Sequence, residues 1–190
     1  MTILGALMGF LLLSGGASSA LPAHATAPKV PVVPSYAVTL TAYNAVPEQT
    51  DNSPLETASG AYSNPEVVAA RSRNLADELP FGTIIEVIGP SVSNNPCGYD
   101  IVAPLIGYRV IADTMNARYT DRIDILFSTE SNYVMKDGRE KNAGVILGIC
   151  SGVSVRVVGH IDMTNPNRLP KTQVELATIV TGKSNALALK

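Results

Sequence analysis

The residues best suited to chemistry are two aspartates, Asp113 and Asp124, which lie eleven positions apart. A run of β-forming residues adjoins each of them, and a turn carrying Asn116, Arg118 and Tyr119 separates them. A chain reversal of this length would bring the two carboxyl groups close together. Paired carboxyl groups are the minimal equipment for acid/base cleavage of a bond between sugars. On spacing alone, however, an ordinary polar turn is the more common explanation.

Asp124 lies inside an alternating run, Arg122-Ile123-Asp124-Ile125-Leu126-Phe127. The alternation places the two isoleucines on a core face and Asp124 on the opposite face. Because aspartate is disfavoured in strands, its presence needs a reason. One explanation is that Asp124 lies on a solvated face, where it forms a weak surface ion pair with Arg122. The other is an acid that faces a groove and has a pKa raised by partial burial or a neighbouring carboxylate. Asp113 would end a strand, where an Asp-Thr pair often bonds the local backbone.

Several short runs of β-forming residues are separated by turn-forming residues such as Asn52-Ser53-Pro54. The runs cover residues 38–43, 67–70, 83–88, 108–112, 122–127 and 153–160. This pattern predicts an all-β fold with minor α content, in which about six strands form a small barrel or a sandwich. We expect short helical stretches at residues 73–79 and 130–135, and an added edge strand at residues 174–180.

Length and composition narrow the function classes. A chain of 190 residues suits one compact domain. Its 14 Lys and Arg against 16 Asp and Glu argue against a nucleic-acid partner, as do three Phe and no Trp. After residue 25 a single histidine, His160, and two cysteines remain, too few for the usual zinc set, so we expect no metal and no cofactor. No serine lies in a G-x-S-x-G elbow, and we expect His160 to be a partly buried structural residue. Catalysis therefore falls to carboxylates and hydroxyls.

The N-terminal segment resembles an export signal. Residues 1–28 hold no Lys, Arg, Asp or Glu, and an apolar run at residues 3–13 precedes Ala23-His24-Ala25. We predict a signal peptide at residues 1–25, a Pro-rich spacer at 26–35, a barrel domain at 36–162 and a C-terminal extension at 163–190. An uncleaved membrane anchor is the alternative. After cleavage we expect no membrane association, and location in the cell wall, the periplasm or the medium.

The two cysteines, Cys97 and Cys150, both lie in segments rich in Gly, Pro or Ser. Such segments are typical of loops, and two loop cysteines in an exported chain predict one disulfide. Two unrelated buried thiols are the alternative. The sequence leaves the oligomeric state open.

Four motifs, in order, resemble those of the 3D domain family. They are TLTAYNAVPEQTD at residues 39–51, TASG at 57–60, VVAA at 67–70 followed by LPFGT at 79–83, and DTMNARYTDRID at 113–124. Together they place the resemblance over about two-thirds of the chain. Four ordered motifs are far more specific than any one alone.

The resemblance implies a six-stranded double-psi β-barrel related to the catalytic barrel of membrane-bound lytic transglycosylase A and to muralytic proteins of spore-formers. These proteins cut the β-1,4 bond between N-acetylmuramic acid and N-acetylglucosamine by attack of the muramyl C6 hydroxyl. The partner would be the glycan strands of peptidoglycan, with Asp124 as the acid/base and Asp113 as its support. The resemblance further implies substrate contacts from Thr41, Tyr43, Thr57, Ser59, Asn116 and Arg122.

The family is named for three aspartates, and the chain departs from it because the remaining one, beside those matched by Asp113 and Asp124, has no clear match. Asn74 and Asp77 are the nearest candidates for it. A non-catalytic barrel that binds cell-wall polysaccharide is therefore the alternative function. An aspartic peptidase is disfavoured, because Met115 stands where that class needs a glycine and the chain holds no second copy of the motif.

Overall fold

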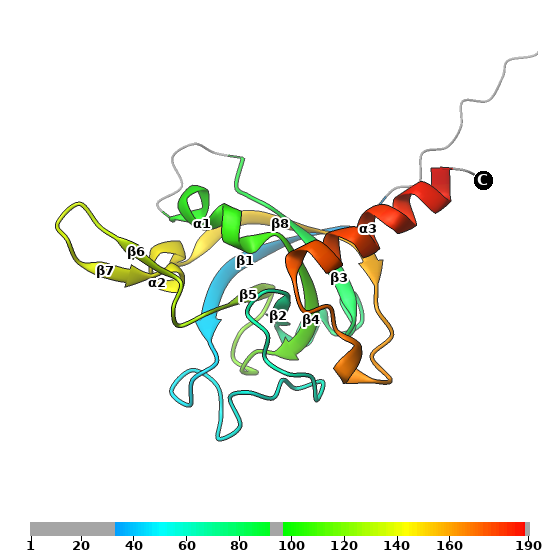
Figure 1. The fold of residues 1–190 in the computed structure, drawn as a ribbon, viewed down its shortest axis with the longest axis horizontal. Coiled ribbons are helices and arrows are strands. Elements are labelled where there is room, and N and C mark those ends of the chain that lie inside the picture. Colours follow the sequence, from blue (N-terminus) through cyan, green and yellow to red (C-terminus); the bar gives the residue numbers. More distant parts are fainter. Residues whose placement is uncertain (1–32, 92–96, 189–190) are drawn as a thin grey trace, which may run out of the picture. The chain divides into compact units, whose positions relative to one another are not determined.

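The structure, a computed structural model, describes residues 33–91 and 97–188. Six strands form a closed barrel in the order β1-β5-β2-β4-β3-β8 (Figure 1). Their bounds are Ser35–Asn44 (β1), Val68–Arg71 (β2), Thr83–Ile88 (β3), Tyr108–Thr114 (β4), Arg122–Phe127 (β5) and Cys150–His160 (β8). The pairs β1–β5 and β2–β4 are parallel and the other pairs are antiparallel, so the barrel is mixed. The predicted all-β class and all six predicted strands are confirmed. The predicted signal peptide and residues 26–32 of the spacer lie outside the described residues.

Two segments differ from the prediction. Residues 130–135 do not form a helix, because β6 (Asn132–Val134) pairs with β7 (Glu140–Asn142) in a hairpin that turns at Gly138, where φ is 80°. Residues 174–180 do not form an edge strand but belong to helix α3 (Gln173–Ala188). Leu176 and Val180, four positions apart, both pack into the core, which is the spacing of one helix face. The short helical stretch predicted within residues 73–79 is present as the 3₁₀ turn η1 (Arg73–Leu75).

The remaining helices are short and lie over one end of the barrel or in its connections (Figure 1). They are α1 (Tyr99–Ile106), α2 (Ala143–Leu147) and the 3₁₀ turn η2 (Pro166–Arg168). A disulfide joins Cys97, just before α1, to Cys150 at the start of β8, as predicted. Among the described residues no helix is long and apolar enough to cross a membrane.

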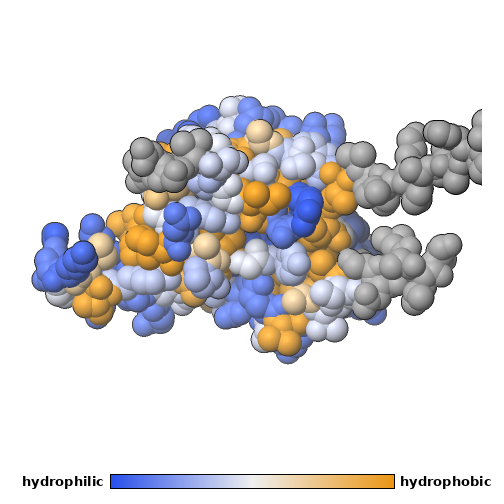
Figure 2. Space-filling model, turned by 90° about the horizontal axis from the view of Figure 1, so that it is seen from above, coloured by the Kyte–Doolittle hydropathy of each residue, from blue (hydrophilic) through white to orange (hydrophobic). Residues whose placement is uncertain are grey.

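One face of the molecule mixes apolar and polar side chains rather than separating them (Figure 2). Figure 2 shows hydrophobic and hydrophilic residues interspersed over one face of the molecule. Exposed apolar side chains include Ile101 on α1, Val134 on β6 and Val174 on α3. The short helices and the hairpin therefore keep part of their apolar surface in contact with solvent.

Two apolar clusters lie on opposite faces of β5. Ile123, Ile125 and Phe127 join one cluster, as their alternation predicts. Leu126 joins the other, together with Tyr43 of β1 and the inner face of α3. Asp124 shares the face of Leu126, so this aspartate lies at the edge of packed apolar surface rather than on a solvated face.

A buried arginine ties α1 to the barrel. Arg109 is 1% exposed, and its guanidinium donates to the carbonyls of Leu105 (2.5 Å) and Ile106 (2.6 Å) in the last turn of α1. It also donates to the carbonyls of Pro65 (2.6 Å) and Leu126 (3.2 Å). Burial lowers the pKa of Arg109 to about 10, so the side chain stays charged at neutral pH. It satisfies carbonyls that the end of a helix otherwise leaves unpaired.

Replacing this arginine should destabilise the whole domain. We expect Arg109→Met to lower the free energy of unfolding by at least about 3 kcal/mol, because several buried carbonyls would lose their donor. Urea-induced unfolding followed by circular dichroism measures the change. The matched control is Arg139→Met, at an exposed arginine of the β6–β7 turn, for which we expect less than about 0.5 kcal/mol. A loss below about 1 kcal/mol for Arg109→Met would show that the buried network is dispensable.

Candidate active site

The register of the barrel sets four residues side by side. Thr41 of β1 lies opposite Asp124 of β5, Asp124 lies opposite Ala70 of β2, and Ala70 lies opposite Asp113 of β4. Residues paired in this way point to the same face of a sheet. Since neighbouring strands are about 4.8 Å apart, the two aspartate backbones are roughly two strand spacings from each other. The structure therefore brings the two carboxyl groups to one face, with a small alanine between them.

A bulge in β4 turns Asp113 toward this face. Ala69 pairs with Ile111, but the next residue, Ala70, pairs with Asp113, so Ala112 is an extra residue in β4. In a regular pairing without the bulge, Ala70 would lie opposite Ala112, and Asp113 would point to the other side of the sheet. The bulge is thus the local irregularity that makes an aspartate pair possible.

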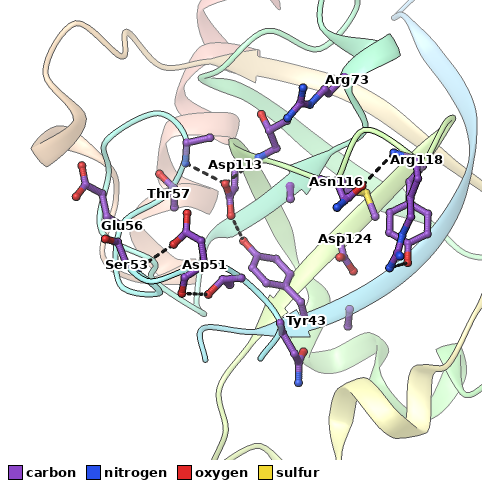
Figure 3. Close-up of a pocket in the computed structure, with 18 of the residues that line it drawn as sticks. Tyr43, Asp51, Ser53, Glu56, Thr57, Arg73, Asp113, Asn116, Arg118 and Asp124 are labelled. Carbon is purple, nitrogen blue, oxygen red and sulfur yellow. Dashed lines mark hydrogen bonds between the residues drawn. The ribbon is translucent and has the colours of Figure 1, made fainter. Parts of the chain in front are cut away.

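The Asp113 carboxylate is held by three donors. One oxygen accepts from the Tyr43 hydroxyl at 2.8 Å (Figure 3). The other oxygen accepts from the backbone N–H of Ala58 at 2.9 Å and from that of Thr114 at 2.8 Å. Charged hydrogen bonds of this length are the strong ones. The carboxylate is therefore fixed in place.

The motif at residues 57–60 supplies one of these donors. It forms a turn that Gly60 closes with φ 80° and an N–H···O bond of 2.8 Å to the Thr57 carbonyl. The backbone N–H of Ser59 donates to the carbonyl of Ala112 at 3.1 Å, which docks the turn on the bulge of β4. The hydroxyls of Thr57 and Ser59 bond each other at 3.0 Å. These residues build the turn that presents the Ala58 N–H to Asp113.

Asp124 lies in a different environment. It is partly buried, and one carboxylate oxygen accepts a hydrogen bond of 2.8 Å from the Thr41 hydroxyl. Burial raises the pKa of Asp124 to about 6, and repulsion by Asp113 adds to the rise, while the Thr41 bond and the charge of Arg122 oppose it. In weakly acidic solution this carboxyl group therefore still carries a proton that it can donate.

Tyr43 lies beside the pair and is 7% exposed. Burial, together with the charge of Asp113, raises the pKa of Tyr43 well above its usual value. The phenol therefore keeps its proton and acts as a donor to Asp113 over the physiological pH range.

Both aspartates line a pocket with a volume of about 870 Å³. Its walls come from the β1–β2 loop, from η1 and from the turn between β4 and β5 (Figure 3). Of the other residues implied as substrate contacts, Tyr43, Thr57 and Asn116 line the pocket. Thr41, Ser59 and Arg122 do not. Thr41 and Ser59 make the bonds already described, and the Arg122 guanidinium stacks 4.8 Å from the centre of the Tyr119 ring.

Sequence reasoning missed several charged wall residues. They are Glu48, Asp51, Glu56, Arg73 and Arg118. Glu48 and Asp51 belong to a quoted motif, and Arg118 lies in the turn between the two aspartates, so their positions offered a signal. Arg73 and Glu56 offered none.

Asn74 and Asp77, the nearest candidates for the third aspartate that the resemblance implies, do not line the pocket. Asn74 instead holds the turn that precedes β5, since its amide donates to the Asp121 carboxylate at 2.7 Å and its oxygen accepts from the Asp121 N–H at 3.1 Å. Asp121 has φ 52°, a conformation that non-glycine residues adopt rarely, so the turn needs this support. Asp77 is exposed. His160, expected to be partly buried, is exposed because it ends β8.

No family model matches the chain, and a search of curated proteins finds no match. Within the described residues, no group of three or more His, Cys, Asp or Glu side chains is arranged to hold a metal ion.

The raised pKa of Asp124 has a consequence for stability. Near pH 4 the carboxyl group is neutral in the folded state, whereas above pH 6 the folded state must hold a partly buried charge that the unfolded chain exposes to water. We expect Asp124→Asn to stabilise the protein by on the order of 2–3 kcal/mol at pH 8 and by little at pH 4. Urea unfolding at the two pH values measures this.

Asp137→Asn serves as the control, because Asp137 is an exposed carboxylate paired with Arg139. We expect no gain from it at either pH. An equal effect of Asp124→Asn at pH 4 and pH 8 would mean that the charge of Asp124 costs the folded state nothing.

Proposed function

We propose that this protein is an exported, lytic-transglycosylase-like enzyme of the 3D domain family, built on a double-psi β-barrel. It cleaves the β-1,4 bond between N-acetylmuramic acid and N-acetylglucosamine in peptidoglycan. The observation that carries the proposal is the pair of carboxyl groups on one pocket wall in unlike environments: Asp113 fixed by three donors, and Asp124 partly buried with a pKa near 6. Two carboxyl groups with separated roles are the usual equipment for glycosidic cleavage.

In the first step the protonated Asp124 donates its proton to the glycosidic oxygen while the bond from that oxygen to C1 of the muramyl residue breaks. The N-acetylglucosamine fragment leaves as an alcohol, and Asp124 becomes a carboxylate. In the second step this carboxylate takes the proton of the muramyl C6 hydroxyl, whose oxygen bonds C1. The products are a 1,6-anhydro end and a reprotonated Asp124, so no water is consumed.

Asp113 supports both steps without exchanging a proton. Burial is the main cause of the raised pKa of Asp124, and the negative charge of Asp113 adds to it, which keeps the acid protonated. The same charge stabilises the positive charge that develops on the sugar ring as the bond breaks. Tyr43 and the Ala58 N–H hold Asp113 in position for this role.

A location outside the cytoplasm fits this substrate. The Cys97–Cys150 disulfide is consistent with an oxidising compartment, and the uncharged N-terminal segment resembles a signal peptide. Both features support export of the domain to the peptidoglycan layer.

A non-catalytic wall-binding barrel is the second candidate. The observation that favours it is that Asn74 and Asp77, the nearest candidates for the remaining family aspartate, do not line the pocket. In that case the same pocket would hold a glycan strand without cleaving it.

Product analysis separates the two candidates. Residues 26–190 incubated with purified sacculi should release muropeptides with 1,6-anhydro ends, which mass spectrometry identifies. Asp124→Asn should lower the rate by at least about a hundredfold, since it removes the acid/base. Asp137→Asn makes the same chemical change outside the pocket and should leave the rate unchanged. Binding to sacculi without release of anhydro products would support the binding module and exclude the enzyme.

The pH dependence tests the assignment of Asp124 as the acid. Because the reaction starts from the protonated form, kcat/KM should fall about tenfold per pH unit above pH 6. Thr41→Val removes a hydrogen bond that stabilises the ionised form of Asp124. The falling limb of the pH profile of kcat/KM should therefore move to higher pH. Thr39→Val, one pleat earlier in β1, should leave the limb in place. A limb that stays fixed or moves to lower pH in Thr41→Val would contradict the assignment.

A further inference from the structure

The pocket is divided by charge. Apart from Asp113 and Asp124, its acidic wall residues, Glu48, Asp51 and Glu56, all come from the loop between β1 and β2. Its two basic wall residues, Arg73 and Arg118, come from η1 and from the turn between β4 and β5. Figure 3 shows Asp51 and Glu56 on one side of the pocket and Arg118 on the other, with Asp113 and Asp124 between them. A ligand that spans the two aspartates therefore meets opposite charge at its two ends.

Arg118 is held in place before any ligand binds. Its guanidinium donates to the Tyr119 hydroxyl at 2.8 Å, and its Cζ lies 4.7 Å from the centre of the Tyr119 ring. Arg122 packs 4.8 Å from the centre of the same ring. Holding a long side chain in this way lowers the entropy that it would lose on binding. The other N–H groups of Arg118 stay available to a ligand.

Arg73 is linked through its neighbour Asn74 to the turn between β4 and β5 that carries Arg118. The residue after it, Asn74, makes two hydrogen bonds to Asp121 in the turn that carries Arg118. Arg73 and Arg118 are both exposed, and neither forms an ion pair with any residue that the structure describes. Two exposed arginines on one pocket wall, without a carboxylate partner among the described residues, are suited to binding an anionic group by their N–H donors.

We propose that Arg73 and Arg118 recognise a carboxylate of the substrate and make the pocket specific for glycans whose sugars bear an anionic substituent. This inference rests on the proposed function. N-acetylglucosamine is neutral, whereas N-acetylmuramic acid carries a lactyl group whose carboxyl is either free or joined to a peptide with carboxylates of its own. The two arginines thus distinguish muramyl glycans from neutral glycans such as chitin fragments.

Binding measurements without turnover test the proposal. In the full domain carrying Asp124→Asn, isothermal titration calorimetry compares chitotetraose with a soluble peptidoglycan tetrasaccharide that bears stem peptides. Arg118→Gln and Arg73→Gln should each weaken binding of the peptidoglycan fragment by about tenfold, the loss expected for one charge-assisted contact. Binding of chitotetraose should change less than twofold. Arg118→Lys, which keeps the charge but loses the planar fork, should fall between wild type and Arg118→Gln.

Arg139→Gln is the matched control, because Arg139 lies outside the pocket and pairs with Asp137. It should bind both ligands as the parent does. If the arginine variants weaken both ligands equally, or neither, the proposed specificity is wrong. This outcome is distinct from failure of the proposed function, in which the unmodified domain releases no anhydro product from sacculi.

Discussion

The site depends on one irregularity of strand pairing, the extra residue Ala112 in β4. Side chains alternate along a strand, so a pairing shifted by one residue sends every later side chain to the opposite face. The bulge turns Asp113 to the face on which the β1–β5–β2 register already places Asp124. The turn at residues 57–60 then docks on the same bulge through the Ala112 carbonyl. With regular pairing the two aspartates would point to opposite faces of the sheet.

Because both aspartates arise from one barrel face, their differences come from what covers each of them. Asp113 lies at the end of its strand, where loop backbone and the Tyr43 hydroxyl can reach it. Asp124 lies within its strand, where the apolar cluster of Leu126 excludes water and the hydroxyl of Thr41 on the neighbouring strand β1 donates a hydrogen bond. Water exclusion raises the pKa of a carboxyl group, whereas hydrogen bonds to a carboxylate stabilise its charge. The division of roles therefore follows from strand position.

Much of this arrangement is local and could be predicted from the sequence. The alternation of Ile123, Asp124 and Ile125 correctly assigned Asp124 to the face away from the isoleucines. What failed depends on contacts distant in sequence. Residues 174–180 are β-branched enough to suggest a strand, yet Leu176 packs on the barrel from a helix. The bulge at Ala112 and the pocket walls likewise depend on pairings between segments that no local pattern specifies.

The most direct test is the titration of the Asp124 carboxyl group, followed by carbon NMR in the native protein and in Asp113→Asn. We expect an apparent pKa near 6 in the native protein and a lower value in Asp113→Asn, because the neighbouring negative charge is gone. A pKa in the ordinary range of free aspartate, unchanged by Asp113→Asn, would contradict this expectation. In that case the two carboxyl groups would share a barrel face but not a chemical role.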